Sequence, residues 1–222
     1  DNVAARLKVD GTTIISADAF GITGNGTQHG TYIEITDNAV ITCTNFAVYH
    51  PQKGELKISG NAKITGASGI EMRAGTLIVT GTPTVTATDE TYDESPLNDG
   101  PRFAGVALGV SRYFAGSENG VTLDIRGGTF KAKDGGYAFC EKDIAVTDAE
   151  DNRDLSFDGA TFEGRLSSQN ETGFIKSGTC TKGVELDYIE AGRQAGVKAD
   201  GGMEVASTIT PFFSVREPPV KN

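Results

Sequence analysis

The chain has 222 residues and a formal net charge of −10, with 29 glycines and no tryptophan. No run of about 18 apolar residues occurs, which excludes a membrane-spanning helix, and the acidic surface disfavours nucleic-acid binding because it repels the phosphate backbone. Abundant glycine, with frequent threonine and serine, is typical of many short strands joined by tight turns.

Seven segments share one pattern: an apolar residue, a skipped position, a second apolar residue, a turn with Gly, Asn or Asp, and a third apolar residue. The alternation places the apolar side chains on one face of a strand, and the turn residues suit a corner with positive φ. In chain order the segments begin at Leu7, Ile33, Leu56, Leu77, Leu123, Leu155 and Gly173. The seventh is degraded, since Gly173 replaces the first apolar residue and only Ile175 and Cys180 keep their positions.

The stretch Gly54–Ala87 contains the pattern twice, and the second copy follows the first by 21 residues. The matching pairs are Leu56 and Leu77, Ile58 and Val79, Gly60 and Gly81, and Ile64 and Val85. Successive segments begin 26, 23, 21, 46, 32 and 18 residues apart, and the interval of 46 holds either two coils or one coil with an insertion. This period predicts an all-β fold, a right-handed parallel β-helix of about seven coils with corner-loop insertions. A β-sandwich is the alternative, but it does not explain the repeated offset.

A second column of short apolar segments lies upstream of several anchors, so each unit holds at least two strands in the same order. Its members are FAVY (Phe46–Tyr49), GIEM (Gly69–Met72), GVAL (Gly105–Leu108) and GYAF (Gly136–Phe139). We expect like residues to stack in the interior, with Phe130 and Phe162 toward the C-terminal end.

Three stretches break the pattern: Ser16–Gly30, the polar loop Thr88–Phe103, and Glu141–Asp154. Near the end, DYIEAGRQAGV predicts a short helix or a capping turn, which a solenoid needs to cover its terminal core. We therefore expect one β-helix domain over residues 1–205, followed by a C-terminal cap or linker over residues 206–222.

The polar loop carries a group of carboxylates, and carboxylate oxygens are ligands that Ca²⁺ prefers. The candidate metal ligands are Asp89, Glu90, Asp93 and Glu94. Their spacing does not match an EF-hand loop, and a solvated insertion without a metal is the alternative.

Two groups of residues have the chemistry of a sugar site, where an aromatic ring stacks on the sugar and polar groups hold the hydroxyls. The first is Arg112, Tyr113 and Phe114, which we expect to expose a cation and aromatic rings at a corner near acidic side chains. The second is Tyr49 and His50. Local packing of the rings, or burial of Tyr49 at a turn, is the alternative in each case.

The three cysteines, Cys43, Cys140 and Cys180, are far apart and resemble neither a disulfide framework nor a CxxC metal site. We expect small buried hydrophobes, with one long-range disulfide as the alternative. No paired aspartates lie on a repeat strand, and neither His29 nor His50 has a recognisable catalytic setting, so no catalytic residue is assigned.

The segments AVYHPQKGELKISG, GIEMRAGTLIVTG and LDIRGGTF resemble modules of large surface proteins of gut Firmicutes, and the likeness covers roughly Asn45 to Val205. Those proteins are pectate-lyase-like β-helices. The resemblance implies an exported bacterial protein, extracellular or at the cell surface. Phage appendage β-helices, usually trimeric, share the fold and the composition, which makes a virion the alternative location.

Three functions follow as hypotheses. The first is a non-catalytic cell-surface stalk or adhesin that binds a glycan or host-surface ligand. The second is a phage or prophage tail, receptor-binding or decoration protein. The third is a polysaccharide lyase or hydrolase.

Overall fold

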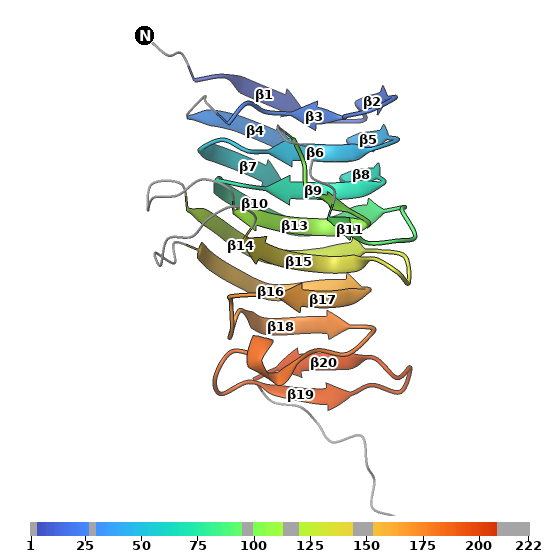
Figure 1. Cartoon of the computed structure of the whole chain (residues 1–222), viewed down its shortest axis with the longest axis vertical. Coiled ribbons are helices and arrows are strands. Elements are labelled where there is room, and N and C mark those ends of the chain that lie inside the picture. Colours follow the sequence, from blue (N-terminus) through green and yellow to red (C-terminus); the bar gives the residue numbers. More distant parts are fainter. Residues whose placement is uncertain (1–3, 27–29, 95–99, 113–119, 144–152, 208–222) are drawn as a thin grey trace, which may run out of the picture.

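The computed structural model describes residues 4–26, 30–94, 100–112, 120–143 and 153–207, and these form an all-β structure dominated by long parallel sheets. The strands stack along one axis from the N-terminal to the C-terminal end (Figure 1). This arrangement is compatible with a β-helix. Among the described residues no helix has the length and apolar character needed to cross a membrane.

The larger assembly is a 12-stranded sheet, which we call the long sheet. Its main ladder contains β1 (Arg6–Val9), β4 (Thr31–Ile35), β7 (Gly54–Ile58), β10 (Gly75–Ala87), β14 (Val121–Lys131), β16 (Arg153–Glu163) and β18 (Ile175–Cys180). A side ladder of β2 (Ile14–Ala17), β5 (Val40–Cys43) and β8 (Lys63–Gly66) joins the second half of β10.

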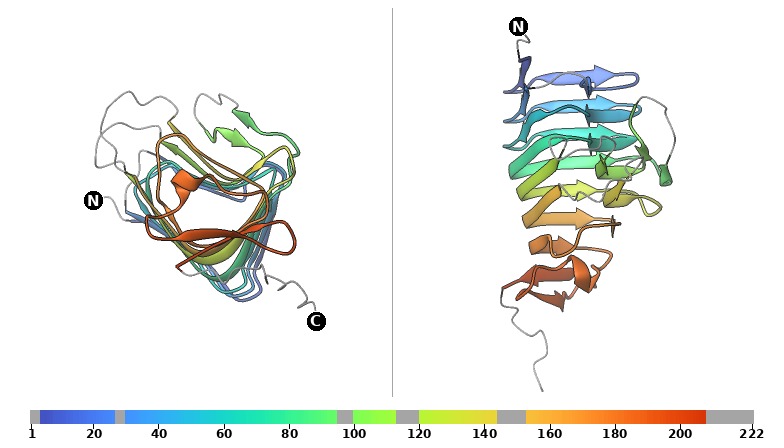
Figure 2. Two further views of the ribbon diagram at one scale, coloured as in Figure 1. Left: turned by 90° about the horizontal axis from the view of Figure 1, so that it is seen from below. Right: turned by 60° about the vertical axis from the view of Figure 1, so that its left-hand side comes forward.

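The second assembly is a six-stranded parallel sheet, which we call the short sheet. Its strands are β3 (Ile22–Thr23), β6 (Phe46–His50), β9 (Ser68–Met72), β13 (Val106–Arg112), β15 (Tyr137–Asp143) and β17 (Arg165–Ser168). Seen along the stack, the strands of successive layers lie over one another (Figure 2). A layer here means consecutive strands such as β7, β8 and β9.

The register confirms the repeat residue by residue. The six apolar anchors form one continuous column along the main ladder: Leu7, Ile33, Leu56, Leu77, Leu123 and Leu155. Because β10 pairs directly with β14, the interval of 46 residues contains an insertion and not a further strand of the ladder. The second column is also confirmed, since Val48, Ile70, Leu108 and Phe139 stack in the short sheet.

Glycine is required where the layers turn. Gly60 has φ +67°, and a Cβ there would lie 2.7 Å from backbone atoms of Asp37 in the layer above. Gly81, one layer on, has φ +78°, and a Cβ there would lie 3.0 Å from the Gly60 backbone. A side chain at either position would strain the backbone and collide with the neighbouring layer.

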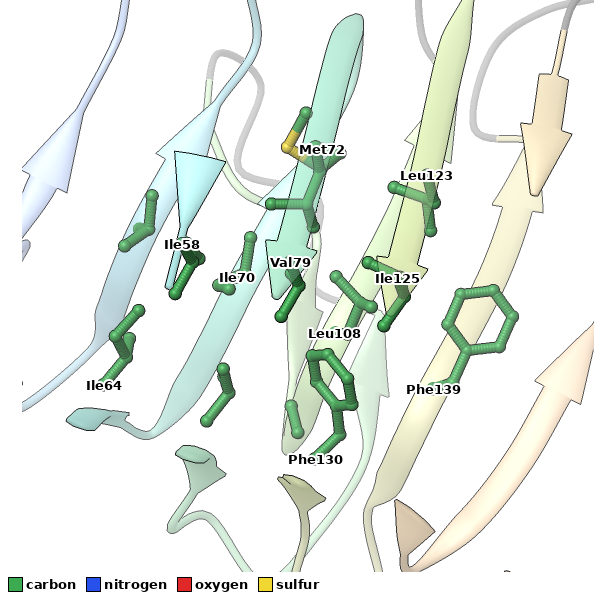
Figure 3. Close-up of a cluster of buried hydrophobic side chains, with 14 of the residues drawn as sticks. Ile58, Ile64, Ile70, Met72, Val79, Leu108, Leu123, Ile125, Phe130 and Phe139 are labelled. Carbon is green, nitrogen blue, oxygen red and sulfur yellow. The ribbon is translucent and has the colours of Figure 1, made fainter. Parts of the chain in front are cut away.

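The core is an apolar interior between the sheets, lined by stacked aliphatic side chains (Figure 3). Toward the C-terminal end it becomes aromatic, and Phe130 and Phe162 stack with ring centroids 5.8 Å apart, as predicted. All three cysteines are free and buried, so the expectation of small buried hydrophobes is confirmed for them.

The irregular stretches take three forms. Ser16–Gly30 contains the end of β2 and the short β3. The polar loop includes a two-stranded antiparallel arm, β11 (Asp93–Glu94) with β12 (Phe103–Ala104), which lies beside the short sheet (Figure 2). Residues 144–152 of the third stretch lie outside the described part of the chain.

The C-terminal end closes by a reversal of strand direction. A 3₁₀ turn, η2 (Leu186–Tyr188), precedes β19 (Gln194–Val197) and β20 (Met203–Ala206), and β20 pairs antiparallel with both β18 and β19. The sequence predicted this cap within DYIEAGRQAGV. Of the predicted cap or linker over 206–222, all but Ala206 and Ser207 lie outside the described residues.

Candidate functional site

The first predicted sugar site is only partly described. Arg112 is the last residue of β13 and is 1% exposed, so the expectation of an exposed cation is wrong. Its Nε donates to Oδ1 of Asp143 at 3.3 Å, which explains how the charge is tolerated in the interior. Tyr113 and Phe114 lie outside the described residues.

The second predicted pair, Tyr49 and His50, ends β6 and is buried. The Arg73 guanidinium lies over the Tyr49 ring, 5.2 Å from its centroid. Nδ1 of His50 lies 3.2 Å from the Ala74 carbonyl oxygen, and burial lowers the pKa of this imidazole. Of the alternative of burial at a turn, the burial of Tyr49 is confirmed, but the residue lies within a strand.

The four predicted metal ligands do not converge. Asp89 accepts hydrogen bonds from the backbone and side chain of Thr91, and Glu94 pairs with Lys142. Across the described part of the chain, no three His, Cys, Asp or Glu side chains gather as a metal site would need. Calcium binding by this loop stays a prediction.

Charged residues instead lie buried on the short sheet. Glu71, on the outer face of β9, accepts from Nε of Arg73 at 3.3 Å and from the Ser111 hydroxyl. The backbone amides of Arg102 and Phe103 also donate to it, at 2.7 and 3.2 Å. Burial raises the pKa of Glu71, and Arg73 with these donors opposes the rise. The Glu71 carboxylate thus fastens the arm onto the sheet.

A second buried carboxylate, Glu141, lies on β15, two strands from β9 along the short sheet. It forms an ion pair with Arg153, which also bonds to Asp143. The remaining donors are Ser168 Oγ, the backbone amides of Gln169 and Asn170, and Asn170 Nδ2. This network joins β15, the start of β16 and the turn after β17 into one charged edge.

Two adjoining pockets open on the outer face of the short sheet, and we call them the Tyr137 pockets because Tyr137 and Ser167 line both. The larger, of about 610 Å³, lies between β17 and the cap, with Arg165, Lys182, Glu185 and Tyr188 among its lining residues. The smaller, of about 360 Å³, lies beside the arm, with Tyr92, Lys142 and Gln169 among its lining residues.

Tyr137 is held from both sides. The Arg165 guanidinium lies over its ring at 4.3 Å and donates to the carbonyls of Gly135 and Gly136. Tyr92 from the arm meets the same ring edge-on, with centroids 5.0 Å apart. The ring is therefore fixed by a cation–π contact and an aromatic contact, which keeps its orientation defined.

The polar groups around this ring come from several elements. Lys142 pairs with Glu94 of the arm, and Lys182, after β18, lies 3.1 Å from Asp134. Cys140, beneath Tyr92, is inert as a nucleophile at neutral pH because burial raises the pKa of its thiol to about 12. A fixed ring with hydroxyl, amide and cationic groups about it suits recognition of a polar ligand that has an apolar face.

Sequence reasoning missed Tyr137, Arg165 and Tyr92. Strict alternation from the buried Phe139 would place Tyr137 inside, but the register shifts between these two residues and Tyr137 turns outward. The available signal was Arg165, three residues after the sixth repeat segment, whose pairing with Tyr137 needs that register. No family model, curated protein or solved structure matches the chain in comparisons with known proteins.

Proposed function

We propose that the chain is a right-handed parallel β-helix of about seven coils that serves as a non-catalytic bacterial cell-surface module, a stalk or adhesin, and binds glycan at the Tyr137 pockets. The in-register columns and the positive-φ corners between layers support the β-helix. The resemblance to Firmicutes surface modules supports the location.

The stacked pair of Tyr137 and Arg165 carries the glycan proposal. The Tyr137 ring, held 4.3 Å from a guanidinium, lines both pockets beside hydrogen-bond donors, and a sugar ring with its C–H face and hydroxyls needs aromatic surface and donors close together. Tyr92 and Tyr188 extend the aromatic lining on either side of this pair.

The hydrogen bonds that Glu141 already accepts support a binding role and not a catalytic one. Glu141, the one acidic residue of the described chain that lines the smaller pocket, already accepts hydrogen bonds from four different residues. A carboxylate whose oxygens already accept this many hydrogen bonds has few acceptor positions left for contact with a substrate.

The test is a binding screen of the purified chain against soluble plant and host polysaccharides, with reducing ends assayed in each mixture. We expect binding without product, and a loss of at least about tenfold in affinity for Tyr137→Ala. Tyr32→Ala is the matched control, because Tyr32 also stacks with an arginine, Arg6 at 5.3 Å, but on the long sheet.

Four results would overturn parts of the proposal. Absence of binding to every polysaccharide tested would contradict the glycan role. Release of new reducing ends would show that the protein is an enzyme. An equal loss for Tyr32→Ala would move the site away from the Tyr137 pockets. A trimeric mass by light scattering on the same sample would favour the phage alternative.

A further inference from the structure

The two Tyr137 pockets adjoin one another along the stack of layers. Tyr137 of β15 and Ser167 of β17 line both of them. From these shared residues the larger pocket continues toward the C-terminal cap, where Lys182 and Tyr188 line it. The smaller pocket continues in the other direction, toward the arm, where Tyr92 lines it. A ligand that fills both pockets therefore passes Tyr137 and runs along the stack.

The larger pocket keeps polar groups available for a ligand. Arg165 donates to the carbonyl oxygens of Gly135 and Gly136, which uses two of its five N–H groups, and within the described residues it forms no ion pair. Lys182 pairs with Asp134, but Asp134 is 92% exposed, so water competes for this contact. The larger pocket thus offers two cations with spare donors to a single sugar unit.

The charged groups of the smaller pocket are already paired. Glu141 forms an ion pair with Arg153, and Lys142 forms one with Glu94 of the arm. The Tyr92 ring remains as the main surface for a ligand. A pocket of this kind holds a sugar weakly by itself, but it adds affinity when a linked neighbour already keeps the sugar there.

The smaller pocket depends on the position of the arm. Two residues of β9 hold the return strand of the arm: the Ser68 hydroxyl donates to the Phe103 carbonyl oxygen, and Glu71 accepts from the Phe103 amide. Tyr92 is placed in turn by its edge-on contact with Tyr137. The insertion between two repeats therefore supplies one wall of the pocket, and buried contacts with β9 fix that wall.

On the basis of the glycan role proposed above, we further propose that the arm builds the second of two consecutive sugar subsites. The ligand is then a linear oligosaccharide of at least two linked units. One unit occupies the larger pocket between β17 and the cap, and its linked neighbour occupies the smaller pocket beside Tyr92. The second unit raises the affinity because the linkage holds it at its subsite.

The probe is a length series: the mono-, di-, tri- and tetrasaccharide prepared from the polysaccharide that binds tightest in the screen. Isothermal titration calorimetry with the full chain measures the affinity for each length. We expect the wild type to bind the trisaccharide at least about tenfold more tightly than the monosaccharide, because only the longer ligand reaches both subsites.

Substitutions in the two pockets should separate the subsites. Tyr92→Ala should lower the affinity for the trisaccharide at least about fivefold and change that for the monosaccharide less than about twofold, because Tyr92 lines the smaller pocket alone. Lys142→Met should act in the same direction, since it removes the pairing with Glu94 of the arm. Lys182→Met, in the larger pocket, should weaken both lengths by the same factor.

Lys131→Met is the matched control. It removes a Lys–Glu pair, to Glu163 at 2.7 Å, but on the long sheet, and should leave both affinities unchanged.

The outcomes distinguish this proposal from the glycan role on which it rests. Failure of every polysaccharide to bind would overturn the glycan role and the paired subsites together. Equal affinities for the monosaccharide and the trisaccharide would leave the glycan role standing and overturn the paired subsites. Equal losses for both lengths in Tyr92→Ala would also overturn them, as would an effect of Lys131→Met that matches that of Lys142→Met.

Discussion

Both sheets contain parallel strands, but they differ in where they place charged side chains. The long sheet sends Leu, Ile and Val inward in unbroken columns and carries exposed ion pairs on its outer face, as with Asp124 and Arg126. The short sheet stacks a similar apolar column inside, but its outer face and its edge bury charges, as with Glu71 and Arg73. The first sheet is a repeated scaffold, and the second carries the features that occur once.

This difference between the sheets indicates which surface can be specific for one ligand. A repeated apolar column tolerates exchange between like residues, because each layer contacts only its neighbours. The buried Glu71 carboxylate depends on one arginine and two backbone donors, because losing a partner would leave its charge uncompensated. The insertion arm and the Tyr137 pockets lie on this second kind of surface.

The largest expected effect tests the scaffold. Ile58→Asp places an unpaired carboxylate at a fully buried position of the long sheet and should abolish the fold, since such a loss approaches the whole stability of a domain. Ile78→Asp makes the same change on the outer face and should cost about 1 kcal/mol or less. Urea unfolding followed by circular dichroism gives both values, and a cooperative melt of Ile58→Asp close to wild type would contradict the account.

The next effect compares a buried ion pair with an exposed one at the same i, i+2 spacing. Arg73→Met leaves Glu71 buried and unpaired and should cost about 3–5 kcal/mol, while Arg126→Met should cost less than about 1 kcal/mol.

The double variant Glu71→Gln with Arg73→Met should recover much of that loss, because it removes the unpaired charge. Chemical denaturation of the wild type and these three variants measures the costs and the recovery. Equal costs for the two arginine substitutions would remove the distinction between the sheets.

A smaller effect tests how closely successive layers of the long sheet pack. Gly60→Ala and Gly11→Ala both place a methyl group at positive φ, which costs about 1–2 kcal/mol. At Gly11 nothing lies within 4 Å of the added atom, whereas at Gly60 the Asp37 backbone is 2.7 Å away. Gly60→Ala should therefore be the more destabilising in thermal melts, and the reverse order would show that stacking is not tight at this corner.

The smallest effect concerns pH. Burial lowers the pKa of His50 below its unfolded value near 6.5, so its contribution to stability is present above pH 6.5 and is lost as the pH falls below it. Unfolding free energy should decline from pH 7.5 to pH 5.5 in wild type and decline less in His50→Gln. The comparison between the two proteins cancels the opposite contribution of Glu71, whose raised pKa adds relative stability in acid. Identical pH profiles would contradict this role for His50.

The scaffold was predictable because its information is repeated. Leu56 and Leu77 hold the same position in two similar segments 21 residues apart, and the structure pairs them directly. The candidate site was not predictable by the same reasoning, because each of its contacts occurs once. The local sequence predicts an exposed cation at Arg112, whereas its partner Asp143 lies 31 residues away in the sequence. Tyr137 required a register shift, which alternation alone does not reveal.

Hydrogen–deuterium exchange with the tightest-binding polysaccharide tests the central claim most directly, since it maps the ligand onto one sheet or the other. We expect slower exchange over 135–142 and 165–169, around Tyr137 and Arg165, with no change over 54–58 and 75–80 of the long sheet. Protection confined to the long sheet would show that glycan recognition does not reside on the short sheet and would contradict the account.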